Sequence, residues 1–214
     1  MVFTQQWPQS ICQDLRRTHE HDCAIPENVT SWTVHGLWPN RNGTEGPNFC
    51  NSSVKFDFST LKPILPELLM TWPNLYTDTE IASFWEHEWT KHGTCAMSLD
   101  ALATEFKYFS MGLNLHKRYD YMQTLKQFGI TPRDNYLYQF TDILNAFNKG
   151  FGGRTNLQCT YDPETKTQYI AQVEICVSKS FQVIDCEHHS SSGFGRIEGC
   201  RDTEQIALPL IHHP

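Results

Sequence analysis

Residues 169–186 read YIAQVEICVSKSFQVIDC, and this stretch decides the class of fold that we expect. Apolar side chains recur at every second position over residues 169–177, a period that predicts a half-buried β-strand. A short polar turn follows and leads into residues 181–185, so the two segments should form a β-hairpin. Cys176 and Cys186 flank the turn and could meet across it.

The segments outside this hairpin mix the periods of strands and helices. The expected elements are strands at 2–7 and 32–37, helices at 60–72, 100–118, 121–128 and 141–150, and loops at 39–53 and 188–195. Gly129 should end the third helix, and Thr141 should cap the fourth. Because helices and antiparallel strands follow no regular β-α-β alternation, the predicted class is α+β.

Length, composition and charge favour one globular domain. The chain has 214 residues, of which 39% are hydrophobic, so we expect a single domain over residues 1–214. No apolar run approaches the ~20 residues that span a bilayer. The formal charge of −7 argues against a broad basic surface for nucleic acid. Adding one charge for each of the ten histidines would bring it from −7 to +3, which hints at work at acid pH, in a lysosome, an endosome or an acidified extracellular space.

Cysteines and glycosylation motifs indicate an oxidising compartment. The eight cysteines contain no C-x-x-C pair, so four disulfides are favoured over a zinc cluster, although eight cysteines allow 105 pairings. N-x-S/T triplets begin at Asn28, Asn42 and Asn51 and predict N-glycosylation. These features favour a secreted protein. Because residues 1–7 lack the basic start and long apolar stretch of a signal peptide, we expect that the signal has been removed.

Residues 83–95, SFWEHEWTKHGTC, concentrate charged and imidazole side chains on a predicted helix. Ser83 and Glu86 have the spacing of a capping box. Gly93 suits the far end, which leaves a helix of about three turns between them.

One face of this helix should present a carboxylate, an ammonium and an imidazole together. Glu88 and His92 lie about 40° apart on an α-helix, Lys91 lies about 60° to the other side of Glu88, and His87 lies on the flank. The run HEWTKH is similar to the zinc motif H-E-x-x-H, in which the histidines are four residues apart. His87 and His92 are five apart, about 140° around the helix, and Lys91 would repel a cation, so no metal is expected.

A second stretch, residues 31–39, reads SWTVHGLWP and predicts a strand that carries another histidine. On a regular strand Thr33, His35 and Leu37 share a face. Gly36 would let a ligand come close to the histidine. Trp38 offers a flat surface on which a base could stack.

Both stretches resemble the two active-site segments of the ribonuclease T2 family, the acid ribonucleases that include plant self-incompatibility glycoproteins. They match nearly throughout and in the family's order, and residues 3–12, FTQQWPQSIC, resemble the family's first strand. The similarity covers residues 3–95 well and the C-terminal half mainly through cysteine placement and the hairpin. It implies a central antiparallel sheet packed against several helices.

The resemblance also implies roles for individual residues. His35, Glu88 and His92 would be catalytic, with Lys91 and His87 assisting. The residues implied to contact bases are Trp38 on the side before the cut, and Gln6, Asn74, Leu75 and Phe84 on the other side. The implied disulfides are Cys12–Cys23, Cys50–Cys95, Cys159–Cys200 and Cys176–Cys186. Asn40 stands where many relatives carry aspartate; because an amide can donate as well as accept, the base preference could differ.

These residue types suit the cleavage of RNA, which carries its own nucleophile in the 2′-hydroxyl. One histidine can take that proton and another can protonate the departing 5′-oxygen, which would leave a 2′,3′-cyclic phosphate. The resemblance implies His92 as the base and His35 as the acid, with Lys91 and Glu88 stabilising the transition state. The sequence therefore predicts a metal-independent, monomeric endoribonuclease for single-stranded RNA that needs no cofactor and leaves DNA intact.

Two other functions are compatible with the sequence. A glycoprotein of the same fold could act mainly by binding a receptor or a glycan. An extracellular metal binder could use three histidine pairs, which are His19 with His21, His188 with His189, and His212 with His213. We expect these pairs to lie in solvated loops and in the C-terminal tail.

Overall fold

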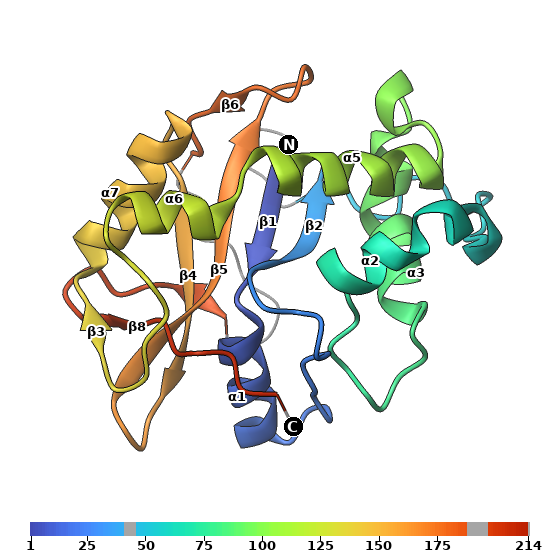
Figure 1. Cartoon of the computed structure of the whole chain (residues 1–214). Helices are drawn as coiled ribbons and strands as arrows, with labels where there is room; N and C mark the ends of the chain where they lie inside the picture. The colour runs from blue at the N-terminus through green and yellow to red at the C-terminus, as the bar shows by residue number, and fades with distance from the viewer. Residues whose placement is uncertain (41–45, 188–196, 214) are drawn as a thin grey trace.

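A computed structural model describes residues 1–40, 46–187 and 197–213 of the chain. Its centre is a sheet in which the strands follow the order β2-β1-β5-β4-β7, with β6 and β8 also paired to β5 (Figure 1). The strands are β1 (Val2–Gln6), β2 (Thr33–Trp38), β3 (Leu137–Tyr138), β4 (Asn156–Asp162), β5 (Thr167–Val177), β6 (Val183–Ile184), β7 (Glu198–Gly199) and β8 (Ile206–Ala207). All pairs are antiparallel except β5 with β8, which run parallel.

Helices lie around this sheet and fill most of the connections between strands. The α-helices are α1 (Pro8–Thr18), α2 (Leu65–Thr71), α3 (Ser83–Glu88), α4 (Thr94–Ala96), α5 (Glu105–Arg118), α6 (Tyr121–Gln127) and α7 (Phe140–Phe151). Two 3₁₀ helices, η1 (Phe58–Ile64) and η3 (Asp100–Leu102), and one π-helical turn, η2 (Trp89–Gly93), complete the set. The predicted α+β class is confirmed.

The two faces of the central sheet differ in polarity. One face contributes apolar side chains to the main core, among them Phe3 of β1, Leu37 of β2 and Val173 of β5. Helices α5, α6 and α7 bury their apolar sides in that same core, and α5 packs directly against β1 and β2 (Figure 1). The opposite face carries polar side chains in register across the strands, including Gln6 opposite Gln172. The candidate site lies on this polar face.

Most expected elements are confirmed, and the errors have local causes. The predicted helix over 60–72 is wrong as one element, because a 3₁₀ helix ends at Ile64 and α2 begins beside Pro66. Proline has no N–H to donate, so it fits only the first turn of an α-helix. Helix 100–118 is likewise divided, because Thr104 caps a new helix by accepting from the N–H of Lys107.

The ends of the next two helices test the expected caps. Gly129 follows α6 in the left-handed region with a φ of 75°, as predicted. The prediction that Thr141 caps the following helix is wrong. Helix α7 begins at Phe140 after Gln139, whose side chain makes no capping hydrogen bond.

The strand of the opening stretch is confirmed, but its predicted exposure is wrong. Strand β5 is buried over almost its whole length, on both faces, because β1 and β4 flank it at the centre of the sheet. Strand β4 was not predicted, although Leu157, Cys159 and Tyr161 alternate with polar residues there. The hairpin of β5 with β6 is confirmed.

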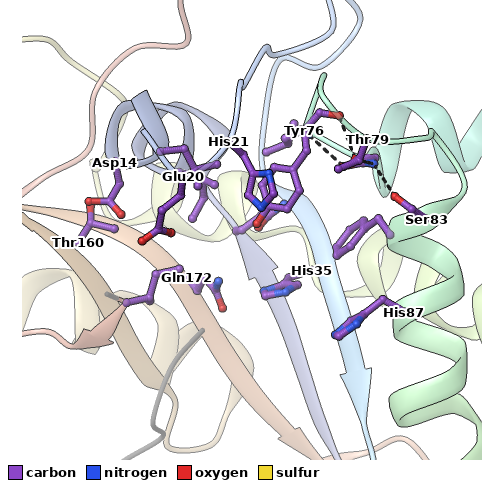
Figure 2. Close-up of a pocket in the computed structure, with 17 residues that line it drawn as sticks. Asp14, Glu20, His21, His35, Tyr76, Thr79, Ser83, His87, Thr160 and Gln172 are labelled. Atoms are coloured by element: carbon purple, nitrogen blue, oxygen red, sulfur yellow. Dashed lines mark hydrogen bonds between the residues drawn. The ribbon is translucent and has the colours of Figure 1, made fainter. Parts of the chain in front are cut away.

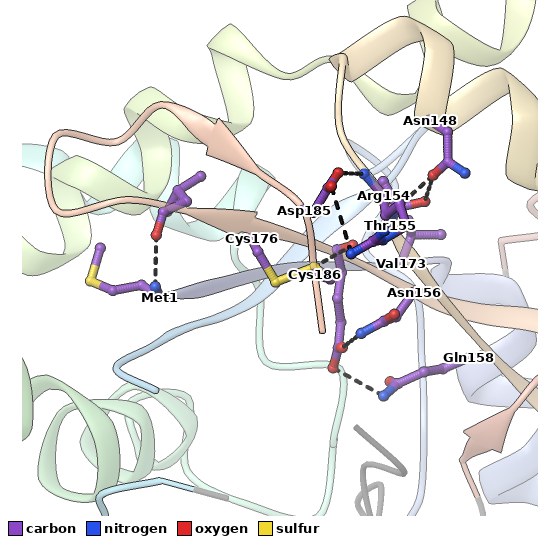
Figure 3. The surroundings of a disulfide bond; sticks show 12 residues. Met1, Asn148, Arg154, Thr155, Asn156, Gln158, Val173, Cys176, Asp185 and Cys186 are labelled. Atoms are coloured by element: carbon purple, nitrogen blue, oxygen red, sulfur yellow. Dashed lines mark hydrogen bonds and ion pairs between the residues drawn. A yellow bond between two sulfur atoms is a disulfide. The ribbon is translucent and has the colours of Figure 1, made fainter. Parts of the chain in front are cut away.

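All four implied disulfides are present, with Cys12 bonded to Cys23, Cys50 to Cys95, Cys159 to Cys200, and Cys176 to Cys186. Figure 3 shows the last of these, which fastens the chain after β6 to the end of β5. Such crosslinks stabilise a fold mainly by restricting the unfolded chain.

Two predictions reach beyond the described residues. The expected loop over 188–195 and the glycosylation triplet at Asn42 lie outside them. Asn28 and Asn51 are described and exposed. Among the described residues, no helix has both the length and the apolar character needed to cross a bilayer.

Candidate active site

A β-bulge in β2 aims His35 away from the core. Thr4 pairs with Gly36 and Gln5 pairs with Val34, so His35 is the extra residue between them. The prediction that Thr33, His35 and Leu37 share a face is therefore wrong, since Leu37 lies in the apolar core and His35 lines a cavity. The indole of Trp72 donates a 2.9 Å hydrogen bond to the carbonyl of His35, which holds the bulge.

The second polar segment is one continuous helical run in which α3 passes into the π-helical turn η2 and then into α4. The expected capping box is wrong, because α3 is preceded by Ala82, and the Ser83 hydroxyl instead donates to the carbonyl of Glu80. Gly93 does not end the helix either. A Cβ atom there would lie 2.3 Å from the ring of Trp89, so the glycine allows that ring to pack against the turn.

The π turn changes which side chains meet. A π-helix bonds residue i to residue i+5, so residues five apart come onto one face. His87 and His92 have ring centroids 6.3 Å apart, and ligand atoms of His87, Glu88 and His92 all lie within 4.8 Å of one another. The angular argument that separated these two histidines by about 140° is thus wrong, because it assumed α-helical geometry. The three side chains could reach one ion, although Lys91 places a positive charge beside them.

Trp38 connects the histidine of the strand with the carboxylate of the helix. Its indole N–H donates a 2.9 Å hydrogen bond to Oε2 of Glu88. Its ring lies 5.1 Å from the ring of His35 and 5.4 Å from that of His92, measured between centroids. The rings of His35 and His92 therefore both lie beside the same indole ring.

Gly36 makes room for this contact and not, as expected, for a ligand. A Cβ atom at Gly36 would lie 2.0 Å from Nε1 of Trp38 and 2.5 Å from Oε2 of Glu88. The indole can fold back over the strand only because this position carries no side chain.

Burial dominates the electrostatics of the site. Glu88 is fully buried, which raises its pKa to about 8, although the hydrogen bond from Trp38 and the charge of Lys91 act in the other direction. Burial lowers the pKa of His35 to about 4 and that of His92 to about 2, and Lys91 lowers both further. Burial and Lys91 also lower the pKa of His87. Burial thus favours the uncharged forms of Glu88 and of the three histidines.

A cavity of about 390 Å³ opens beside His35 (Figure 2). The implied base-contact residues Gln6, Asn74, Leu75 and Phe84 all line it, together with His35 and His87. Its size and its mixture of apolar walls with a few polar groups fit a small-ligand site. Tyr76, whose ring stacks on that of His21 at 4.4 Å, and Gln172 also line the cavity, and sequence reasoning missed both.

Two of the residues expected to contact a base, Asn74 and Asn40, differ from the others in their surroundings. Asn74 holds its own loop, because its amide donates to Thr79 and to the carbonyl of Glu80, and its side-chain oxygen accepts from the N–H of Tyr76. Asn40 is half-buried just beyond β2, and it is not among the residues that line the cavity.

The Cys50–Cys95 disulfide positions the loop after β2 against the end of the helical run. Next to it, the N–H of Phe49 donates a 2.8 Å hydrogen bond to the carbonyl of Lys91. Phe49 has a positive φ of 54° and a 63% exposed side chain, a backbone conformation that a bulky residue adopts at a cost. The disulfide and this hydrogen bond fix the loop beside Lys91.

The expected histidine pairs do not form a metal site among the described residues. His21 bonds to Asp78, and His212 bonds to Asp134, at 2.9 Å in each case. His213 contacts the carbonyl of Ile25 at 3.4 Å. His188 and His189 lie outside the described residues.

Comparisons with known proteins agree with this fold and site. The sequence profile of the Ribonuclease T2 family matches residues 1–186. Ribonuclease Oy of Magallana gigas is 43% identical over 213 residues, which cover 99% of this chain and 96% of that protein. Ribonuclease T2 of Homo sapiens is 37% identical over 186 residues, which cover 85% of this chain and 67% of that protein.

Solved structures give the same result. The crystal structure of human RNase T2 superimposes with a TM-score of 0.80 at 32% identity and covers 98% of this chain and 97% of that one. RNase NT in complex with 5′-AMP gives a TM-score of 0.80 at 31% identity, with the same coverage. The chain belongs to the Ribonuclease T2 family of enzymes.

The role of Gly36 can be tested by adding one methyl group. Gly36→Ala should break the Trp38–Glu88 hydrogen bond and lower the free energy of unfolding by about 1–3 kcal/mol, as overpacking does in tight sites. Urea unfolding measures the change. Gly199→Ala is the matched control, because a Cβ atom there meets nothing within 4 Å. Equal effects of the two substitutions would contradict the close contact at Gly36.

The burial of Glu88 predicts a dependence of stability on pH. Between about pH 4.5 and 8 the unfolded chain releases the Glu88 proton and the folded chain keeps it, because the folded pKa is raised to about 8. The wild type should therefore lose stability as pH rises, and Glu88→Gln should gain relative to it by up to about 1.4 kcal/mol per pH unit. Urea unfolding at pH 5 and pH 7.5 measures this difference. Glu86→Gln, at an exposed position on the same helix, is the matched control substitution.

Proposed function

We propose that this protein is a secreted, metal-independent endoribonuclease that cleaves single-stranded RNA through the 2′-hydroxyl and leaves a 2′,3′-cyclic phosphate. The observation that carries the proposal is the approach of His35 from the sheet and His92 from the helix to the same indole ring. Membership of the Ribonuclease T2 family supports the reaction class. No contact of the described residues favours the alternative of a protein that acts mainly by binding a receptor or a glycan.

The similarity of the two segments to the family's active-site segments supports one assignment of acid and base. A general acid must hold its proton when the general base has lost its own. The resemblance implies His35 as the acid and His92 as the base, and burial lowers the pKa of both rings. Both ring nitrogens of His92 find no hydrogen-bond partner among the described residues, which leaves the ring able to accept a proton.

The bound phosphate should raise both histidine pKa values, because a nearby negative charge favours the imidazolium. Even so, the protonated fraction of His35 falls as the pH rises above its pKa, so the enzyme should work best at acid pH. Glu88 stays neutral in that range and can donate a hydrogen bond to a phosphoryl oxygen, whereas Lys91 stabilises the charge that develops there. DNA lacks the 2′-hydroxyl nucleophile and should not be cut.

The cavity beside His35 suits the base that follows the cut. Gln6 and Phe84 line it together with His35, and the rings of Phe84 and His35 have centroids 5.8 Å apart. Trp38 is half-exposed, and its outer face can stack on the base that precedes the cut. Asn40 is close to Trp38 in the chain and is proposed to contact that same base.

The proposed setting is extracellular or lysosomal, with the protein acting as a monomer. Four disulfides form and persist in oxidising compartments. The exposed Asn28 and Asn51 can accept glycans, and Asn42 is a third proposed acceptor. An acid compartment also matches the protonation that His35 requires.

Loss of either histidine should abolish most activity. His35→Phe and His92→Phe should each lower the turnover of a defined RNA by at least ~100-fold, because a general acid or base contributes roughly 10²–10⁴. Mass spectrometry of the product ends should show a cyclic phosphate from the wild type. His212→Phe is the matched control, because this exposed histidine bonds to Asp134 and should be dispensable. Near-normal cleavage by either catalytic variant removes that histidine from the mechanism.

Chelation tests the proposed independence from metal. Because the reaction needs only side chains and the 2′-hydroxyl, cleavage should be unchanged in excess EDTA. The cluster of His87, Glu88 and His92 makes this a demanding test, since its ligand atoms are close enough to share an ion. Loss of activity in EDTA that zinc restores would contradict the proposal.

A further inference from the structure

Gln172 occupies a central place on the polar face of the sheet, next to His35. It lies on β5 directly between Gln6 of β1 and Gln158 of β4 in the strand register, and its side chain is 3% exposed. It lines the same cavity as His35. In Figure 2, Gln172 extends from β5 on one side of the His35 ring, and His87 extends from α3 on the other.

The side chains of Gln172 and Gln158 have different partners although the residues are neighbours. Gln158 is equally buried at 3% exposed, and its amide donates a 3.0 Å hydrogen bond to Oε1 of Glu174. The side chain of Gln172 instead lies beside His35 in the cavity and raises the pKa of the imidazole, as a hydrogen-bond partner does. The bulge in β2 makes this possible, because it turns His35 toward the polar face where Gln172 lies.

The effect of Gln172 on the ring indicates which amide atom would face His35. Gln172 raises the pKa of His35, so it favours the protonated imidazole. Because an imidazolium has only N–H donors, the amide atom that favours it is the oxygen, as an acceptor.

We propose that Gln172 is a positioning residue for His35: its amide oxygen accepts an N–H of the imidazole, fixes the ring plane and tautomer, and keeps the acid form available for catalysis. This inference rests on the proposed role of His35 as the general acid. With one nitrogen held by Gln172, the proton on the other nitrogen is the one that can pass to the departing 5′-oxygen. After the transfer, the neutral ring retains the N–H that Gln172 binds.

The other groups around His35 explain why such help is needed. Burial and the charges of His87 and Lys91 all disfavour the imidazolium, and His92 lies beside the same indole ring of Trp38 as His35. Glu88, whose pKa is raised to about 8, is neutral at acid pH and offers no counter-charge. The other titratable side chains that line the same cavity are Asp14, Glu20, His21 and Tyr76. Of the described groups that act on the pKa of His35, Gln172 is the one that raises it.

Three substitutions of Gln172 separate this role from a structural one. Gln172→Met keeps the length and burial but removes the acceptor, so the His35 pKa and the alkaline limb of kcat/KM should both fall by roughly one pH unit. Gln172→Asn shortens the amide by one methylene and should shift both in the same direction. Gln172→Glu places a carboxylate against the ring and should move both upward by roughly one unit or more.

The experiment uses two independent readouts on the full chain. NMR titration of isotope-labelled histidines, assigned with His35→Phe, gives the pKa of His35 without reference to activity. The pH profile of kcat/KM on a dinucleoside phosphate gives the limb that the acid controls. Gln158→Met is the matched control, and it should leave both the titration and the limb in place.

Each outcome decides between distinct interpretations. An unshifted His35 titration in both Gln172→Met and Gln172→Asn overturns the proposed hydrogen bond. A higher KM at every pH with an unmoved limb means that Gln172 contacts the base instead, which also overturns the proposal. A third outcome is a shifted His35 titration with an unmoved alkaline limb of kcat/KM. It supports the hydrogen bond between Gln172 and His35 but contradicts the proposed role of His35 as the general acid.

Discussion

A hydrogen bond from Trp38 to Glu88 joins the two halves of the site, strand β2 and the helical run that contains the π turn. It exists because Gly36 leaves space for the indole to fold back over the strand. Glu88 is fully buried, and its burial raises the pKa of its carboxyl. The same indole lies beside the rings of both His35 and His92.

The helical half of the site depends on the π turn. In an α-helix His87 and His92 would face different directions, but the wider turn places both beside Glu88. Close packing of Trp89 against Gly93 accompanies this winding. The result is a group of imidazoles and one carboxyl that are all driven toward their neutral forms by burial, with Lys91 as the nearby positive charge. Such a group is suited to passing protons and not to holding net charge.

The strand half depends on the unequal faces of the sheet. Helices α5, α6 and α7 cover the apolar face and fix the strands, whereas the polar face presents a register of glutamines beside the cavity. The bulge in β2 moves His35 from one environment to the other. Gln172 then lies beside a buried imidazole whose protonated form is disfavoured by burial, His87 and Lys91, and this is the basis of the role proposed for it.

The sequence by itself determined the class of fold, the hairpin of β5 with β6 and the identity of the polar residues in the site. These features depend on local periodicity and on the types of residue that RNA cleavage needs, and both can be recognised along the chain. The resemblance of residues 83–95 to known ribonucleases further indicated which histidines matter. The four disulfides followed from that resemblance and not from spacing.

Only the tertiary structure decided how these residues meet. The sequence placed Leu37 on the same face as His35, because a regular strand has a period of two and a bulge has no clear local signal. It separated His87 from His92, because the angular argument assumed a regular α-helix and the segment Trp89–Gly93 is a π turn, in which Trp89 packs against Gly93. The sequence also did not predict that Gln172 lies beside His35. Contacts between strands far apart in the chain depend on the strand register, which is set only when the sheet assembles.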